Sequence, residues 1–485
     1  MKSVTILTIA AMAMAAATGC SHDTPTPSPE PPVKGGEFNE FGFTTTAPVT
    51  LSVDYGDMAG MPANVYFEVY DTCPVEETET AYAKIAGVEP LYAGYTDGQG
   101  RFEGTIELPA YIRKAYVLTP AFYARTLLEA TRSGDMLTAS AESGAPANAA
   151  PASTRAKEYH STAVERDGWK TWLGSYDTTY GSIGYEYDGD LKVKNYGALL
   201  KAHASVFDTT KKCPKEYRSS RDLYLEKSAE VVITLLGSNT CWNSSMGYYY
   251  YKTGNKPKSL ADANVVMIFP NTQDGRWSNS PWESRLYQGV ERGTAVQLIY
   301  YPEIADGSKA GATTVFPADY RIGFVLATNA WTNRLRAGDK KYRAATSDGL
   351  SVNNNGVAYQ TPRTAVFRYT DKKSGINSVL FSFEDHTNDE NFSDVVFTMT
   401  SNPVDAVTDI PSVDVNDGKK TANVLRGIYA FEDLWPSRGD YDMNDVMVRS
   451  DYEKVFNEKG VFEESFMLKT FANFAGNANG LAVTL

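Results

Sequence analysis

Apolar and polar residues alternate along much of the chain with a period of two, which is the pattern of a half-buried β-strand. In the run Val65–Tyr70, for example, the polar Glu68 stands between apolar neighbours. Longer apolar runs, such as Glu230–Leu236 and Asn264–Pro270, are typical of strands with both faces buried. No helical period separates these runs, so the sequence predicts an antiparallel, all-β protein. The stretch Leu191–His203 has a mixed pattern and indicates no element.

The predicted strands fall into blocks that are separated by stretches rich in Pro, Ala, Ser and Gly. Further strands are expected at Val49–Val53, Leu91–Tyr95, Ala115–Thr119, Gly247–Tyr251, Thr294–Tyr301, Arg321–Ala327, Ala365–Tyr369, Tyr452–Phe456 and Glu464–Thr470. We therefore expect several domains, with a small β-sandwich, a large jelly-roll-like β-sandwich and a partial C-terminal β-domain. The predicted segments are a signal peptide (1–19), a Pro-rich tether (20–45), the small sandwich (46–125), an Ala/Ser/Pro linker (126–160), the large sandwich (161–402), a connector (403–420) and the C-terminal domain (421–485).

A turn in the small domain carries a first resemblance. The run Thr96–Phe102 has the pattern Thr-Asp-x-x-Gly-x-Phe, in which the glycines permit positive φ and Asp97 can close an Asx-turn. The pattern resembles the turn of carboxypeptidase-regulatory-like, transthyretin-type sandwiches. In that family the turn is structural, so the resemblance implies a transthyretin-like fold and a structural role for Asp97.

The N-terminus has the pattern of an export signal. A basic Met1-Lys2 start is followed by the apolar run Val4–Ala17, which is too short to span a bilayer as a mature helix. The run ends in Ala17-Thr18-Gly19-Cys20, which resembles the bacterial lipobox, with Ala17 where Leu is usual. The resemblance implies lipidation of Cys20, a membrane partner and an outer membrane lipoprotein of the cell envelope. An ordinary signal peptide remains the alternative.

Composition narrows the choice of partners. The net charge of −13 argues against nucleic acid or anionic lipid as the main partner. Three cysteines remain after Cys20; Cys213 and Cys241 are close enough in sequence to pair, and small buried thiols without a role are the equal alternative. The aromatic run Gly247–Tyr251 suits a carbohydrate platform, although a core strand with a cross-strand ladder is the commoner use of such residues.

One sequence block occurs twice and carries most of the chemistry. Phe383-Glu384-Asp385 and Phe431-Glu432-Asp433 each lead through a short loop into Asp-x-(Asp/Asn)-x-(Asn/Ser)-Asp and then an apolar triplet. Three residues follow Asp385 before this run, and six follow Asp433. Such a repeat indicates one structural unit that is used twice.

Alternating acids and amides of this kind are typical of calcium loops in β-proteins, because calcium takes six to eight oxygen ligands. The predicted ligands of the second block are Glu432, Asp433, Asp440, Asp442, Asn444 and Asp445; those of the first block are Glu384, Asp385, Asp389, Asn391 and Asp394. The first block carries fewer charges, so we expect it to bind calcium more weakly or to be a relic. The alternative for both blocks is a turn held by Asx hydrogen bonds.

An enzymatic use of the same acids is not expected. A Glu and an Asp near Trp435 could serve as general acid and base on a glycan. Neighbouring residues of a strand point to opposite faces, however, so Glu432 and Asp433 are predicted not to face one substrate. The chain has no recognisable nucleophile, zinc or phosphate-binding motif, and His160, His203 and His386 are isolated.

The second block also carries a family resemblance. Phe431–Asp445 matches the Phe-Glu-Asp-Leu-Trp-Pro…Gly-Asp-Tyr-Asp-Phe-Asn-Asp signature of LruC-domain envelope lipoproteins almost throughout, with Met443 at the usual aromatic position. The resemblance implies an envelope location and a C-terminal domain that is incomplete at Leu485. That family has no established activity. We therefore expect a lipid-anchored, non-enzymatic protein for surface display, adhesion or ligand binding; the alternative is a glycan-binding or glycan-processing envelope protein.

Overall fold

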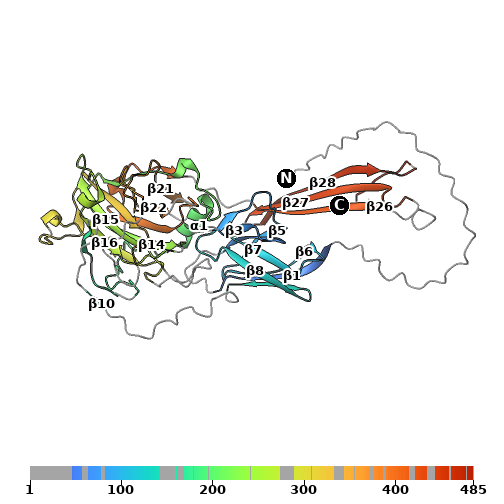
Figure 1. The fold of residues 1–485 in the computed structure, drawn as a ribbon, viewed down its shortest axis with the longest axis horizontal. Helices are drawn as coiled ribbons and strands as arrows, with labels where there is room; N and C mark the ends of the chain where they lie inside the picture. The colour runs from blue at the N-terminus through green and yellow to red at the C-terminus, as the bar shows by residue number, and fades with distance from the viewer. Residues whose placement is uncertain are drawn as a thin grey trace, which may run out of the picture. The chain divides into compact units, whose positions relative to one another are not determined.

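The computed structural model describes residues 46–485 with gaps at 57–63, 78–81, 142–158, 161–168, 178–179, 195, 241, 274–288, 307, 332–342, 354, 372–375, 386–388, 414–420, 434–442, 458–459, 477 and 484–485. Strands dominate the described residues, and α1 (Gly197–Val206) is the α-helix among them. The predicted all-β, multi-sheet class is therefore confirmed (Figure 1). No helix within these ranges is long and apolar enough to cross a membrane.

The N-terminal region forms a seven-stranded sheet with the order β5-β2-β7-β8-β9-β1-β6. Its strands are β1 (Thr46–Asp54), β2 (Tyr66–Tyr70), β5 (Tyr92–Tyr95), β6 (Arg101–Pro109), β7 (Lys114–Leu118), β8 (Leu127–Ser133) and β9 (Met136–Ser140); β3 (Val75–Glu77) and β4 (Tyr82–Lys84) form a separate hairpin. Asp97 Oδ1 accepts the N–H groups of Gln99 and Arg101 at 2.8 and 2.9 Å, which is the expected structural turn.

The linker prediction fails at its start, because β8 and β9 lie within residues 126–140. Strand β9 pairs in parallel with β1, with Thr50 opposite Met136. Its residues alternate between exposed and buried positions, and the buried ones include the small Ala139. Small residues make the period of two hard to recognise, although Leu137 and Ala139 are fully buried.

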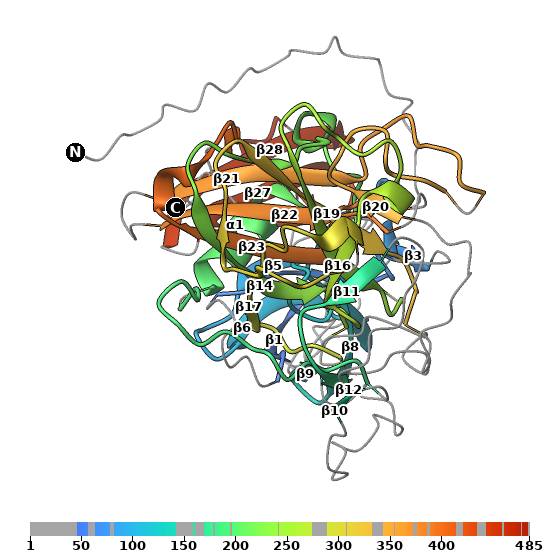
Figure 2. The same ribbon diagram turned by 90° about the vertical axis from the view of Figure 1, so that its left-hand side faces the viewer.

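The large domain is a sandwich of two seven-stranded sheets (Figures 1 and 2). One sheet has the order β11-β16-β15-β19-β13-β24 with β20 beside β19, and the other has the order β17-β14-β23-β22-β21-β25 with β18 beside β14. The strands are β11 (Trp169–Trp172), β13 (Leu223–Leu225), β14 (Ala229–Ser238), β15 (Ser245–Lys252), β16 (Val265–Phe269), β17 (Ala295–Gln297), β18 (Val315–Phe316), β19 (Tyr320–Ala327), β20 (Arg343–Ala345), β21 (Thr364–Asp371), β22 (Ile376–Phe383), β23 (Val395–Asn402), β24 (Val407–Thr408) and β25 (Ser412–Val413).

Aromatic contacts between the two sheets fix the core of this sandwich. The ring of Phe324 on β19 lies 5.1 Å from Phe381 on β22 and 5.0 Å from Phe397 on β23, both edge to face. These residues belong to one buried cluster that draws on both sheets. The core thus holds β22 and β23 firmly at the point where their connecting loop begins.

The remaining elements are short, apart from the C-terminal sheet. That sheet has the order β26-β27-β28, with β26 (Thr421–Phe431), β27 (Val446–Asn457) and β28 (Gly460–Asn473). Helix α1 lies in the stretch for which the sequence indicated no element, and it buries Leu199, Leu200, Ala202 and His203. The other short elements are β10 (Tyr159–His160), which pairs with β12 (Tyr176–Asp177), and the 3-10 turns Lys215–Tyr217, Leu260–Asp262, Ile304–Asp306 and Val404–Ala406.

Candidate metal centre

Each Phe-Glu-Asp block is the loop of a β-hairpin. In the first hairpin, β22 and β23 are antiparallel and Phe383 pairs with Val395, so residues 384–394 form the loop. In the second, β26 and β27 are antiparallel and Phe431 pairs with Val446, so the loop is 432–445. The Phe is the last strand residue in both hairpins, and the apolar triplet opens the returning strand. The repeat is therefore a repeat of structure as well as of sequence.

The two loops share a hydrogen bond from backbone to carboxylate. The Asp385 N–H donates to Asp394 Oδ2 at 2.6 Å, and the Asp433 N–H donates to Asp445 Oδ2 at 2.8 Å. In each loop the last acid thus closes back onto the residue two positions beyond the strand end. These backbone hydrogen bonds to a carboxylate oxygen explain the fixed position of this last Asp.

A second shared hydrogen bond involves the Glu of each block. Glu384 Oε2 accepts the Phe392 N–H at 3.1 Å, and Glu432 Oε2 accepts the Met443 N–H at 3.3 Å. Both donors have positive φ, 58° at Phe392 and 55° at Met443, which is uncommon for large side chains. The left-handed turn at these positions bends the loop back over its own Glu.

These bonds bring three carboxylates together in each hairpin. Ligand oxygens of Glu384, Asp385 and Asp394 all lie within 4.8 Å of one another, as do those of Glu432, Asp433 and Asp445. The prediction that Glu432 and Asp433 point to opposite faces is therefore wrong. It assumed that both residues continue the strand, but β26 ends at Phe431, and beyond that residue the alternation of a strand no longer applies.

The first cluster is almost completely buried. Glu384 is 1 %, Asp385 4 % and Asp394 2 % exposed, and Asn391 and Ser393 are buried beside them. Burial raises the pKa of Asp385 to about 7 and, helped by the neighbouring carboxylates, raises the pKa of Glu384 and of Asp394 well above the ordinary range. Three carboxylates that repel one another in a buried site favour a cation among them.

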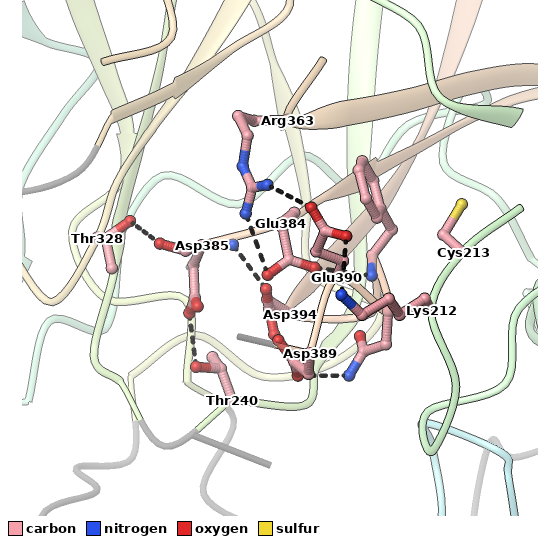
Figure 3. Close-up of polar contacts among 12 residues, drawn as sticks. Lys212, Cys213, Thr240, Thr328, Arg363, Glu384, Asp385, Asp389, Glu390 and Asp394 are labelled. Atoms are coloured by element: carbon pink, nitrogen blue, oxygen red, sulfur yellow. Dashed lines mark hydrogen bonds and ion pairs between the residues drawn. The ribbon is translucent and has the colours of Figure 1, made fainter. Parts of the chain in front are cut away.

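Side chains from other strands support this cluster (Figure 3). Thr240, which follows β14, donates its hydroxyl to Asp385 Oδ2 at 2.5 Å, and Thr328, which follows β19, donates to the Asp385 carbonyl at 3.0 Å. Arg363, just before β21, places Nη2 3.3 Å from Glu384 Oε1. No local sequence pattern predicts these three residues, because each is far from the block in sequence and has no neighbouring motif.

The rest of the first loop shows the hydrogen-bonding role that was the alternative prediction for its polar residues. Asn391 Oδ1 accepts the Ser393 N–H at 2.7 Å, which is an Asx hydrogen bond. The Asn391 side-chain amide donates to Asp389 Oδ2 at 2.7 Å and to the Thr209 carbonyl at 3.1 Å. Asn391 therefore shapes the loop, while Glu384, Asp385 and Asp394 form the acidic cluster.

The second cluster is more open, since Glu432, Asp433 and Asn444 are each partly exposed. Two of its predicted ligands, Asp440 and Asp442, lie outside the described residues, as do Cys20, Cys241 and His386. The part of this loop that the structure describes places Glu432, Asp433 and Asp445 together, as in the first hairpin.

Other candidates from the sequence belong to the core. Tyr248 and Tyr249 are fully buried, so the core interpretation holds for these two residues of the aromatic strand. His203 is fully buried with Nε2 2.9 Å from Ser382 Oγ, and burial lowers its pKa to about 3. Cys213 is free and buried, and burial raises the pKa of its thiol to about 12.

Comparison with known proteins gives two family matches. Residues 47–141 match the domain of unknown function DUF8469, and residues 316–402 match the domain of unknown function DUF4114. The second match contains the first hairpin together with Thr328 and Arg363. No curated protein and no solved structure matches the chain. The domain matches carry no activity, and the LruC resemblance of residues 431–445 stays a prediction.

Proposed function

We propose that this chain is a calcium-stabilised β-protein of the cell envelope, anchored through a lipid on Cys20 and used for surface display, adhesion or ligand binding. The observation that carries the metal part is the buried convergence of Glu384, Asp385 and Asp394, whose oxygens lie within 4.8 Å of one another. Hard oxygen donors of this type are the ligands that calcium prefers.

The position of the cluster suggests what calcium would do. The loop joins β22 to β23, and Asp385 also binds the ends of two other strands through Thr240 and Thr328. A cation at Asp385 would therefore stabilise the ends of strands in both sheets of the sandwich. Relief of repulsion between buried carboxylates would raise the stability of the folded domain, as a ligand specific to the native state must. This is a structural role that needs no catalysis.

The display part rests on the sequence. The lipobox-like end at Cys20 and the Pro-rich stretch after it, with Pro25, Pro27 and Pro29, suit a tethered body outside the cytoplasm. Calcium is abundant outside cells, where sites of modest affinity remain filled. A tethered β-domain stiffened by calcium suits adhesion or ligand capture. Glycan hydrolysis is less favoured, because the acids of the first loop are shielded from solvent.

The metal proposal is tested by thermal melts of the full chain in chelator and in millimolar calcium. The wild type should melt several degrees higher with calcium, and Asp385→Ala/Asp394→Ala should lose that shift. The matched control is Asp405→Ala, which removes an exposed acid paired with Lys227 at 2.5 Å and should keep the shift. Equal melting of the wild type in both solutions would reject calcium binding.

The envelope proposal has its own test. Cells that express the wild type should yield lipid-labelled protein that partitions into the detergent phase. Cys20→Ala should abolish both the lipid labelling and the membrane retention. Binding of whole cells to immobilised matrix proteins or glycans, with and without calcium, then separates adhesion from the glycan alternative. A calcium-independent glycan signal together with hydrolysis would favour that alternative.

A further inference from the structure

Among the described residues, Arg363 is the cationic side chain that contacts the first carboxylate cluster directly. It is 1 % exposed, and its guanidinium stands 5.0 Å from the centre of the Tyr359 ring. Nη2 lies 3.3 Å from Glu384 Oε1, and Nη1 lies 3.6 Å from Glu390 Oε1. Its backbone carbonyl also accepts the Glu384 N–H at 3.0 Å, so the residue is fixed to the loop at both ends.

The contacts of Arg363 are long for a buried ion pair. Charge-assisted N–H···O bonds are typically about 2.7–2.9 Å, and bidentate pairs place two such bonds side by side. Arg363 instead divides its two nitrogens between Glu384 and Glu390, and Nη2 has no well-aligned hydrogen bond. A buried, incompletely satisfied cation directed at an acidic cluster points to a role beyond simple pairing.

Charge around the loop is only partly balanced. Glu390 also contacts Arg218 at 3.3 Å and Lys212 at 3.4 Å, so cationic side chains meet at this residue. Figure 3 shows Lys212 and Arg363 at Glu390. The clustered acids Asp385 and Asp394 have no such ion pair among the contacts of the described residues, and Thr240 and backbone groups hold them instead. Among the described residues, the cationic contacts therefore fall on Glu384 and Glu390 and not on these two Asp residues.

We propose that Arg363 is a built-in counter-charge that sets the calcium affinity of the first site. This inference rests on the proposed function. The guanidinium holds Glu384 and neutralises part of the cluster, so the domain folds before calcium arrives. The same positive charge repels an incoming divalent cation and weakens its binding. Arg363 thus shifts the site from tight, permanent binding towards reversible binding.

The second hairpin supplies a natural contrast. Arg363 enters the first site because β21, which it precedes, lies beside β22. In the sheet β26-β27-β28, as far as the structure describes it, β26 is an edge strand, so no strand occupies the place that β21 has beside β22. The position of Arg363 is therefore a property of the sheet around the first hairpin.

The experiment is calorimetric titration of calcium into the full chain carrying Asp433→Asn/Asp445→Asn, so that the heat reports the first site. Arg363→Gln should bind calcium at least about tenfold more tightly than the same chain with Arg363, because a nearby like charge is removed. Arg363→Lys keeps the charge and should stay within about threefold. The control Arg368→Gln, within the strand β21 that Arg363 precedes, removes a side chain bonded to Asn377 at 2.8 Å and should leave the affinity unchanged.

Loss of folding is also informative. If Arg363→Gln is unfolded in chelator, calcium should restore the fold, since the metal replaces the missing charge. Calcium binding that is unchanged or weaker in Arg363→Gln would overturn this inference, as would failure of calcium to restore the fold of that variant. In either case, calcium binding by the wild type would still support the proposed function. If neither the chain with Arg363 nor Arg363→Gln binds calcium, the inference and the proposed function are both overturned. If only Arg363→Gln binds calcium, the counter-charge role of Arg363 is supported and the proposed function is rejected.

Discussion

The two Phe-Glu-Asp hairpins have the same local geometry in different surroundings. Both close through an Asp N–H to the last Asp and bend through a residue with positive φ. In the first hairpin the flanking Phe381 and Phe383 are buried in the sandwich, whereas the matching Tyr429 and Phe431 are 53 % and 42 % exposed. The block determines its own hydrogen bonds, and the surrounding sheets determine how strongly its carboxylates repel.

This difference in burial changes which of the two hairpins we expect to depend more on counter-ions. Counting charges favours the second block, which has Asp442 and Asn444 where the first has Asn391 and Ser393. Burial acts the other way, because an unpaired carboxylate costs far more free energy in the core than at the surface. We therefore expect the first hairpin to depend more on its counter-ions than the second does.

The largest contrast should come from removing the Glu of each block. Glu384→Ala leaves Arg363 buried without its partner and should lower the free energy of unfolding by about 3–5 kcal/mol. Glu432→Ala removes a partly exposed side chain and should cost about 1 kcal/mol. Denaturant unfolding in chelator measures both, and similar losses in the two variants would show that burial does not separate the hairpins.

A smaller contrast of opposite sign is expected at the following Asp. Asp385→Asn removes one of three clustered, buried carboxyl groups and can still accept the Thr240 hydroxyl. In chelator at pH 8 it should stabilise the chain by about 2 kcal/mol, whereas Asp433→Asn should change stability by less than about 0.5 kcal/mol. The same melts repeated with calcium should show that Asp385→Asn has lost much of the calcium-dependent shift. Destabilisation in chelator would mean that Asp385 is already neutralised by protein groups.

The effect of Asp385→Asn should also depend on pH. The folded-state pKa of Asp385, about 7, lies above the value of about 4 for an unfolded Asp, so protonation favours the folded state. The stability that protonated Asp385 contributes is complete below about pH 4 and is lost as the pH rises through 7. In chelator the gain from Asp385→Asn should therefore shrink to less than about 0.5 kcal/mol by pH 4. A gain that is constant from pH 4 to 8 would exclude titration of Asp385 in this range.

The smallest effect tests the shared turn. At Met443, with φ 55°, Gly should be more stable than Ala by about 1 kcal/mol, because Gly adopts the left-handed region without strain. The same difference is expected between Phe392→Gly and Phe392→Ala, although both lose a fully buried ring. Paired unfolding curves measure it, and no preference for Gly at either position would contradict a common turn.

The sequence predicts the repeated unit better than it predicts its environment. Periodicity placed most strands, and the spacing of the two blocks placed both acidic loops, because these features are local. Arg363, Thr240 and Thr328 reach Asp385 and Glu384 from strands that pair only in the folded sandwich, so no local pattern reveals them. Strand β9 was not predicted, because small residues such as Ala139 weaken the apolar signal. The prediction that Glu432 and Asp433 point to opposite faces was wrong because β26 ends at Phe431, before either residue.

The most direct measurement is a crystal structure of the full chain grown with calcium, with anomalous scattering used to locate the ion. We predict a peak about 2.3–2.6 Å from oxygens of Asp385 and Asp394, with Arg363 still beside Glu384. Calcium confined to the second hairpin, or none at either with the carboxylates of the first still converged, would contradict the claim that the buried cluster is a calcium site.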